Sequence, residues 1–266
     1  MSVSSAFDKA RADNRAALVG YLPAGFPTVA GSVDAFHAMV DAGVDLVEVG
    51  MPYSDPVMDG PVIQAAADRA LANGLRTRDV LDVVSKVAGY GVPTVIMTYW
   101  NPVERYGVDA FARDLAGAGG SGLITPDLIP DEAGEWLAAS DAYQLDRIFL
   151  VAPSSTDARI ASTTAACRGF VYATSVMGVT GARETTSTAG PELVARTRTT
   201  TDLPIGIGLG VRDGAQAAAV GAYADAVIVG SALVSCLLDN DDPVTARAAL
   251  TALTADLAAG VRAGRG

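Results

Sequence analysis

Short apolar runs rich in β-branched residues recur along the chain at a nearly constant interval, and this periodicity limits the possible folds more than any other feature. Over eight runs, the interval from one run to the next averages about 30 residues. Ala-rich segments with helical spacing lie between the runs, for example 32–42, 62–73 and 213–220. Strands that alternate with helices form βαβ units and a parallel sheet. The predicted strands are 17–21, 45–50, 93–99, 122–125, 147–152, 169–174, 204–208 and 226–230.

Eight βα units in a chain of 266 residues predict an α/β fold, a single (β/α)8 TIM barrel over residues 1–266. The alternative is a doubly wound open sheet. A dinucleotide-binding sheet carries a Gly-x-Gly-x-x-Gly turn after its first strand, whereas this turn reads Leu22-Pro-Ala-Gly-Phe-Pro27. Surplus residues lie at the N-terminus and at 62–73 and 78–88. We therefore expect extra helices before the first strand and between the second and third.

Composition excludes several classes of protein before any motif is considered. Half of the residues are hydrophobic, so the chain can bury a large core and is not disordered. The net charge of −11 argues against binding to nucleic acid or anionic lipid, because both attract clustered Lys and Arg. We therefore expect neither a nucleic acid nor a membrane as a partner.

Residues that hold metals or form imines are scarce. The chain has one histidine (His37), two cysteines (Cys167 and Cys236) and two lysines (Lys9 and Lys86). One histidine and two distant cysteines do not make a usual zinc site, and neither lysine follows a predicted strand. His37 lies in a predicted helix and is interpreted as structural or exposed, and the cysteines as small buried hydrophobes. Chemistry in this chain is expected to use carboxylates, hydroxyls and backbone amides.

The chain is predicted to be cytoplasmic. Charges are scattered through its first twenty residues, which lack the apolar core of a signal peptide. The two cysteines do not suggest a disulfide framework. The apolar stretch 217–238 resembles a membrane span in length, but Asp225 and Gly230 interrupt it. We interpret this stretch as a helix end, a buried strand and a helix start.

In a (β/α)8 barrel the active site lies at the carboxyl ends of the strands, and Glu48 occupies such a position. Side chains alternate along a strand, so Glu48 shares a face with Leu46 while Val47 and Val49 take the other. If the two valines face the helices, Glu48 points into the barrel mouth. Burial there raises the pKa of a carboxyl group toward the range of general acid/base catalysis. The alternative is a buried ion pair with an arginine.

The loop that follows Glu48 carries two more acids, Asp55 and Asp59. Acids in a loop rich in proline and glycine are usually solvated or cap a helix, and the sequence Asp59-Gly-Pro61 could start one. Glu48 and Asp59, one on a strand end and one on the loop above it, nevertheless form a candidate catalytic pair. Tyr172 ends the sixth predicted strand and is a candidate site residue or a core residue. The polar segment 175–188 after it is either a lid or a simple flexible loop.

Glycine turns follow the seventh and eighth predicted strands, in Gly206-Ile-Gly-Leu-Gly210 and Val229-Gly-Ser231. Loops at these two strand ends form the usual phosphate site of this barrel, where backbone N–H groups and a helix N-terminus hold the anion. The sequence therefore predicts a phosphate site that includes Gly210, Gly230 and Ser231. Arg183 and Arg212 lie near these turns and are either ligands or solvated.

The run Glu48-Val-Gly-Met-Pro-Tyr-Ser-Asp-Pro-Val-Met-Asp-Gly-Pro-Val-Ile-Gln64 resembles the long signature of the tryptophan synthase alpha subunit. Other segments fit the same family in order: Thr98-Tyr-Trp-Asn-Pro102, Gly178-Val-Thr-Gly181, Gly208-Leu-Gly210 and Gly230-Ser231. The resemblance extends over roughly residues 5 to 260. The glycine turns are shared with other phosphate-binding barrels, so the signature run is the specific part.

The resemblance implies a lyase of tryptophan biosynthesis that cleaves indole-3-glycerol phosphate to indole and glyceraldehyde 3-phosphate in a retro-aldol step. By resemblance, Glu48 is the general acid/base that protonates the indole ring carbon, and Asp59 stabilises charge at the indole nitrogen. Tyr172 lines the site near the glycerol chain. Asp55 and Thr180 link two loops on closure. The phosphate is bound by Gly210, Gly230 and Ser231, with Gly181 nearby.

Family likeness also implies a partner, a pyridoxal phosphate-dependent beta subunit in an allosteric alpha2beta2 assembly, and no cofactor in this chain. The alternatives are a stand-alone indole-releasing lyase and a catalytically weak regulatory subunit of the same family. Another phosphate-barrel isomerase or epimerase would need paired Asp or His at the strand ends. One departure is Pro126-Asp-Leu-Ile-Pro130, where many members have Asp-Leu-Pro. The extra residue leaves the role of Asp127 open.

Overall fold

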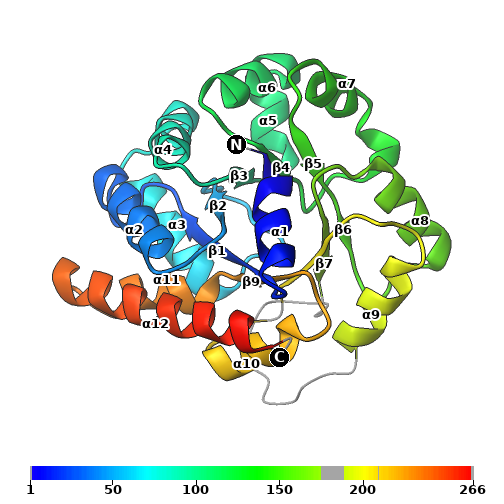
Figure 1. The fold of residues 1–266 in the computed structure, drawn as a ribbon. Coiled ribbons are helices and arrows are strands. Elements are labelled where there is room, and N and C mark those ends of the chain that lie inside the picture. Colours follow the sequence, from blue (N-terminus) through cyan, green and yellow to red (C-terminus); the bar gives the residue numbers. More distant parts are fainter. Residues whose placement is uncertain (1, 175–188, 209, 265–266) are drawn as a thin grey trace.

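The computed structural model describes residues 2–174, 189–208 and 210–264, and these form a barrel of parallel strands surrounded by helices (Figure 1). The predicted (β/α)8 barrel is confirmed, and the open-sheet alternative is wrong. The strands are β1 (Ala17–Pro23), β2 (Leu46–Gly50), β3 (Thr94–Met97), β4 (Gly122–Ile124), β5 (Asp146–Ile148), β6 (Leu150–Val151), β7 (Val171–Thr174), β8 (Ile205–Gly208) and β9 (Ala226–Val229).

The predicted fifth strand, 147–152, is divided into β5 and β6 at Phe149. The strand order in the sheet is β5-β4-β3-β2-β1-β9-β8-β7-β6, so the two pieces lie at its two ends. Ile148 O accepts from Thr125 N beyond β4 at 3.3 Å, and Phe149 O accepts from Tyr172 N of β7 at 3.2 Å. The run therefore changes its hydrogen-bonding neighbour at Phe149, and this change closes the barrel.

Helices cover the outside of the barrel, and the extra helices expected before the first strand and between the second and third are α1, α3 and α4 (Figure 1). The helices are α1 (Val3–Ala12), α2 (Val29–Asp41), α3 (Pro61–Ala72), α4 (Thr77–Gly89), α5 (Trp100–Tyr106), α6 (Val108–Gly117), α7 (Gly134–Ala142), α8 (Asp157–Ala166), α9 (Ala189–Arg198), α10 (Gly214–Gly221), α11 (Ser231–Leu238) and α12 (Pro243–Ala263), with a 3-10 turn η1 (Pro130–Glu132).

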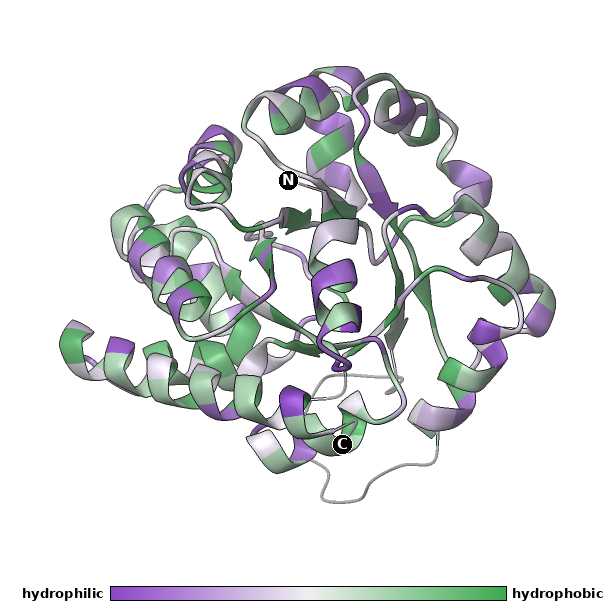
Figure 2. Ribbon diagram, in the orientation of Figure 1, coloured by the Kyte–Doolittle hydropathy of each residue, from purple (hydrophilic) through white to green (hydrophobic). Residues whose placement is uncertain are grey.

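Two apolar clusters follow from the alternation of side chains along the strands. Leu46 belongs to the cluster inside the barrel, whereas Val47 and Val49 belong to the cluster between strands and helices. Figure 2 shows the consequence, since most strands are hydrophobic and hydrophilic residues lie on the outer helices. Helix α1 lies across one opening of the barrel and adds Phe7 to the inner cluster, with its ring centroid 5.4 Å from that of Phe170.

A buried ion pair joins the amino ends of β1 and β2. The Arg15 guanidinium donates to both carboxylate oxygens of Asp45, at 2.6 and 2.9 Å. Leu18 N also donates to the Asp45 carboxylate, at 2.9 Å. Both side chains are only 4 % exposed, so each charged group has the other as its hydrogen-bond partner in place of water. The pair therefore holds the two strands together.

The stretch 217–238 contains the end of α10, strand β9 and α11, as predicted. Among the described residues, α12 is the helix long and apolar enough by composition to cross a membrane. It packs against α2, α10 and α11, and its buried residues include Leu250, Leu257 and Val261. Such packing is typical of a helix that covers the core of a barrel.

Candidate active site

Glu48 lies near the carboxyl end of β2, on the same face as Leu46, and points into the barrel as predicted. Its residue is 1 % exposed, and Oε2 has no hydrogen-bond partner among the described residues. Burial, and then the charge of Asp59, raise its pKa from the ordinary value to about 8. Within the described part of the chain, Glu48 forms no ion pair with an arginine. The geometry therefore favours a proton-transfer group over a structural ion pair.

Asp59 faces Glu48 from the loop that precedes α3. Helix α3 begins at Pro61, as the sequence Asp59-Gly-Pro61 indicated, but its N-cap residue is Gly60, and no side chain among the described residues, Asp59 included, caps it. Burial raises the pKa of the Asp59 carboxyl, and a hydrogen bond from Tyr99 acts in the opposite direction. Gln64 Nε2 donates to the Asp59 carbonyl at 2.7 Å. Glu48 and Asp59 thus lie close enough for the charge of Asp59 to raise the pKa of Glu48.

Two tyrosines lie beside the carboxyl pair. Tyr21 is paired with Glu48 in the register of β1 and β2, and Tyr172 lies on β7. Burial raises both phenol pKa values well above the ordinary value, and the Glu48 charge adds to both shifts. Glycines make room for the rings, because a Cβ on Gly50 would lie 2.3 Å from Tyr21 Oη and one on Gly208 2.5 Å from Tyr172 Oη. Both hydroxyls therefore remain protonated next to the acids.

Tyr21 and Tyr99 were missed by the sequence interpretation, although a signal existed for each. Tyr21 is two residues beyond Val19, an inward residue of the same strand, so alternation places it at the barrel mouth. Tyr99 lies in the segment Thr98-Tyr-Trp-Asn-Pro102, which follows directly after β3. Tyr172, interpreted as either site or core, lies near Glu48.

The two predicted glycine turns meet at one edge of the barrel. Strands β8 and β9 are paired, with Gly208 opposite Ile228, so the residues that follow them lie on the same side. Gly210 has a φ of +71°, a conformation that glycine adopts without strain. Gly230 is the N-cap of α11 and Ser231 its first residue, and no side chain among the described residues caps this helix. The first N–H groups of α11 are therefore available to an anion.

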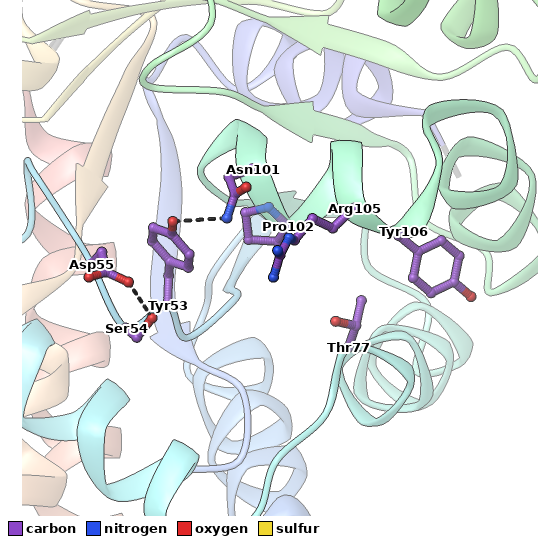
Figure 3. Close-up of a pocket in the computed structure, with 8 residues that line it drawn as sticks. All are labelled: Tyr53, Ser54, Asp55, Thr77, Asn101, Pro102, Arg105 and Tyr106. Carbon is purple, nitrogen blue, oxygen red and sulfur yellow. Dashed lines mark hydrogen bonds between the residues drawn. The ribbon is translucent and has the colours of Figure 1, made fainter.

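Thr180, Gly181 and Arg183 lie outside the described residues. Asp55 is exposed and accepts a hydrogen bond from Ser54 Oγ at 2.5 Å. It lines a hollow of about 410 Å³ beside α5, which Figure 3 shows with Tyr53 pointing toward Asn101. The Asn101 amide donates to Tyr53 Oη at 3.0 Å.

Asp127, whose role the sequence left open, caps helix α5. Its two carboxylate oxygens accept from Trp100 N at 2.9 and 3.1 Å. His37 is remote from this region, on α2, where its ring stacks on Tyr90 with centroids 4.0 Å apart. Among the described residues, the structure contains no cluster of three or more His, Cys, Asp or Glu side chains suited to a metal ion.

The fold and these side chains define the class of protein: a (β/α)8 barrel enzyme with buried carboxyl groups near the carboxyl ends of its strands. The family model of the tryptophan synthase alpha chain matches residues 7–262. The chain belongs to this family.

The similarity of known proteins to this chain extends over nearly its whole length. The tryptophan synthase alpha chain of Salinispora arenicola is 67% identical over 260 residues, which are 98% of this chain and 97% of that protein. The alpha chain of Mycobacterium marinum is 63% identical over 256 residues, 96% of this chain and 93% of its own length. A structure of tryptophan synthase from Mycobacterium tuberculosis matches with a TM-score of 0.92 at 60% identity and covers 98% of both chains. The alpha subunit from Legionella pneumophila matches with a TM-score of 0.86 at 31% identity, also over 98% of both chains.

Proposed function

We propose that Glu48 and Asp59 carry out the reaction of this family in this chain. The chain is a lyase of tryptophan biosynthesis that cleaves indole-3-glycerol phosphate to indole and glyceraldehyde 3-phosphate. The observation that supports the assignment is a buried carboxyl group with a pKa of about 8, opposite a second carboxyl group and with an oxygen that has no hydrogen-bond partner among the described residues. A pKa in this range keeps much of Glu48 protonated at neutral pH, as a general acid requires.

The reaction requires two proton transfers, one from Glu48 to the substrate and one from the substrate back to Glu48. Glu48 donates its proton to the indole ring carbon that bears the glycerol chain, and positive charge develops at the ring nitrogen. The Asp59 carboxylate stabilises this charge. The bond between ring and chain then breaks, its electron pair returns to the ring, and the Glu48 carboxylate takes the proton of the adjacent chain hydroxyl, which becomes the aldehyde. Glu48 ends the cycle protonated, so the protein needs no external acid.

Substrate binding is assigned to residues around this pair. Tyr172 lines the glycerol chain, and Gly210, Gly230 and Ser231 bind the phosphate with the first N–H groups of α11. Two observations support this assignment: β8 pairs with β9, and no side chain in the described part of the chain caps the N-terminus of α11. Gly181 completes the phosphate site, and Asp55 and Thr180 join two loops when the site closes.

The partner is a beta subunit that holds pyridoxal phosphate and receives the indole, in an alpha2beta2 assembly in the cytoplasm. The similarity to a solved tryptophan synthase supports the proposal. The loop after β2 also supports it, because Val57 is 77 % exposed and Met58 41 % exposed in the same loop as Asp55, which lines the hollow. Exposed apolar side chains of this kind are typical of a docking surface.

Indole release by a Glu48→Gln variant tests the catalytic assignment. The amide cannot donate the proton, so turnover of indole-3-glycerol phosphate should fall by roughly 10²–10⁴-fold. The affinity for glycerol 3-phosphate should stay near that of the unchanged chain, because the phosphate site is separate from Glu48. Turnover equal to that of the unchanged chain would refute the role of Glu48.

The same assay with and without a beta subunit tests the partner. Weak release that rises strongly when the beta subunit is added is the expected result. Fast release by the isolated chain, unchanged by the partner, would instead indicate a stand-alone lyase.

A further inference from the structure

We propose that Tyr99 is a positioning residue that holds Asp59 over the barrel mouth, and that Asp127 in turn orients Tyr99. The three residues follow three neighbouring strands, β2, β3 and β4, and form one chain of contacts across their loops. The proposal rests on the proposed function, because it explains how the carboxyl group of Asp59 is held in place.

The first link joins Tyr99 to the loop that carries Asp59. Tyr99 is 5 % exposed, and its hydroxyl accepts a hydrogen bond from Met58 N at 2.9 Å. A hydroxyl that accepts from an N–H group keeps its own proton to donate. The neighbouring Asp59 carboxylate accepts a hydrogen bond from this O–H, which lowers the pKa of Asp59 against the effect of burial. Burial, with a contribution from the same hydrogen bond, raises the pKa of Tyr99 to about 12.

The loop benefits from such an anchor because several of the side chains that precede Asp59 in it are exposed. Ser54, Asp55, Val57 and Met58 are exposed side chains between β2 and α3. Gln64 holds the Asp59 carbonyl from the α3 side, at 2.7 Å. With Tyr99 on its carboxylate side, Asp59 is fixed from two directions.

The second link joins Asp127 to Tyr99. Tyr99 is the N-cap residue of α5, and the next N–H group, of Trp100, donates to both oxygens of Asp127 at 2.9 and 3.1 Å. This carboxylate fixes the first turn of α5 and therefore the direction in which the Tyr99 side chain leaves the backbone. The ring is held further by Tyr53, whose centroid lies 5.4 Å away.

Steady-state kinetics of Tyr99→Phe test the proposal. The ring stays while the hydroxyl is lost, so kcat for indole release should fall about 10- to 100-fold, the loss expected for a hydrogen bond to a charged group. KM should change less, because Tyr99 acts through Asp59. The acid limb of the kcat/KM profile should move to higher pH, because Asp59 loses the donor that lowers its pKa.

Among the described residues, the other titratable groups that face Asp59 should not move the acid limb of the kcat/KM profile of Tyr99→Phe. They are Glu48 on β2 and Tyr21 on β1, and both remain in Tyr99→Phe. Tyr106→Phe is the matched control, since Tyr106 lies on the same helix α5 and donates to Asp114 at 2.7 Å, away from Asp59. Its kcat and pH profile should equal those of the unchanged chain.

Asp127→Ala tests the second link and should lower kcat in the same direction as Tyr99→Phe. Because both act on Asp59, the double variant should lose less activity than the product of the two single losses. Multiplication of the two losses would show that Asp127 does not act through Tyr99.

Asp59→Asn separates this proposal from the proposed function. If Asp59→Asn is inactive while Tyr99→Phe keeps the kcat and acid limb of the unchanged chain, the positioning role is wrong and the role of Asp59 stands. If kcat of Tyr99→Phe falls equally at every pH, Tyr99 is merely structural and the proposal is also wrong. If Asp59→Asn keeps full turnover, the catalytic role of Asp59 is wrong, and with it the reason for positioning it.

Discussion

With the role proposed for Glu48, a single buried carboxyl group couples catalysis to stability. Its pKa is about 8 in the folded chain, against an ordinary value of 4.5. The folded state therefore binds this proton more tightly than the unfolded state does. The resulting stabilisation is fully present below pH 4.5 and is lost as the pH rises through about 8.

Unfolding of Glu48→Gln in denaturant at several pH values checks this coupling. Glutamine does not ionise, so the variant should gain a few kcal/mol in free energy of unfolding relative to the unchanged chain between about pH 5 and pH 9, because the cost of a buried charge is removed. Glu135→Gln, at an exposed position on α7, is the control and should show no such gain. A constant difference between Glu48→Gln and the unchanged chain at all pH values would contradict the prediction.

Under the proposed mechanism, the same carboxyl group should set the alkaline limb of the pH profile of activity. Glu48 must be protonated to act as an acid, so kcat/KM for indole release should fall as the pH rises through about 8. An alkaline limb that remains well above this value would show that Glu48 is not the acid.

At the level of elements, α10 and α12 are held together backbone to backbone through glycines. A Cβ on Gly260 would lie 2.1 Å from the carbonyl oxygen of Gly214, and one on Gly214 would lie 2.5 Å from that of Asp256. The Asp256 carboxylate accepts from Gly214 N at 2.6 Å and so covers the start of α10. This contact fixes α10 behind the β8 turn that carries Gly210.

Gly260→Ala and Gly89→Ala form a matched pair that tests this contact. The methyl group of Gly260→Ala meets backbone, so the free energy of unfolding should fall by about 3 kcal/mol, the upper part of the range for overpacking. A Cβ on Gly89, at the end of α4, meets no atom of the described residues within 4 Å. Gly89→Ala should therefore stabilise the chain by about 0.5–1 kcal/mol through reduced freedom of the unfolded state. Equal effects in chemical unfolding would show that the contact between α10 and α12 is not tight.

For the whole molecule, the proposed site and the apolar cluster under α1 lie at opposite ends of the barrel, so we expect stability and catalysis to depend on different ends. Helix α1 closes the end at which the strands begin, and its residues Val3, Phe7 and Ala10 belong to the inner apolar cluster. Glu48 and Asp59 lie at the other end, where the strands finish. Changes in α1 should therefore affect folding and leave the chemistry unaltered.

Phe7→Ala tests this division. Phe7 is 3 % exposed against Phe170, so its truncation should lower the free energy of unfolding by about 3–5 kcal/mol. Below the new unfolding transition, kcat for indole release should stay that of the unchanged chain. Lys9→Ala, on the exposed face of α1, is the control and should change stability by less than about 0.5 kcal/mol. A loss of kcat in folded Phe7→Ala would show that the two ends are coupled.

The order of elements was predictable because its signals are local. Alternation placed Glu48 on the inward face of β2, and glycine turns marked the ends of β8 and β9. The division of the fifth strand at Phe149 was not predictable, because it depends on which neighbours the run meets when the barrel closes. The cap that Asp127 provides to α5 was missed for a similar reason, since the two are joined through space rather than along the chain.

By itself, the sequence determined the (β/α)8 class, the strand ends that carry chemistry and the residue types available for it, because period and composition are properties of the chain. Only the tertiary structure decided which of those residues act together. Glu48, Asp59, Tyr21 and Tyr99 lie on three different strands and their loops, and their contacts exist only after closure. The pKa of Glu48 also depends on closure, because an apolar surrounding and a facing charge are supplied by other parts of the chain.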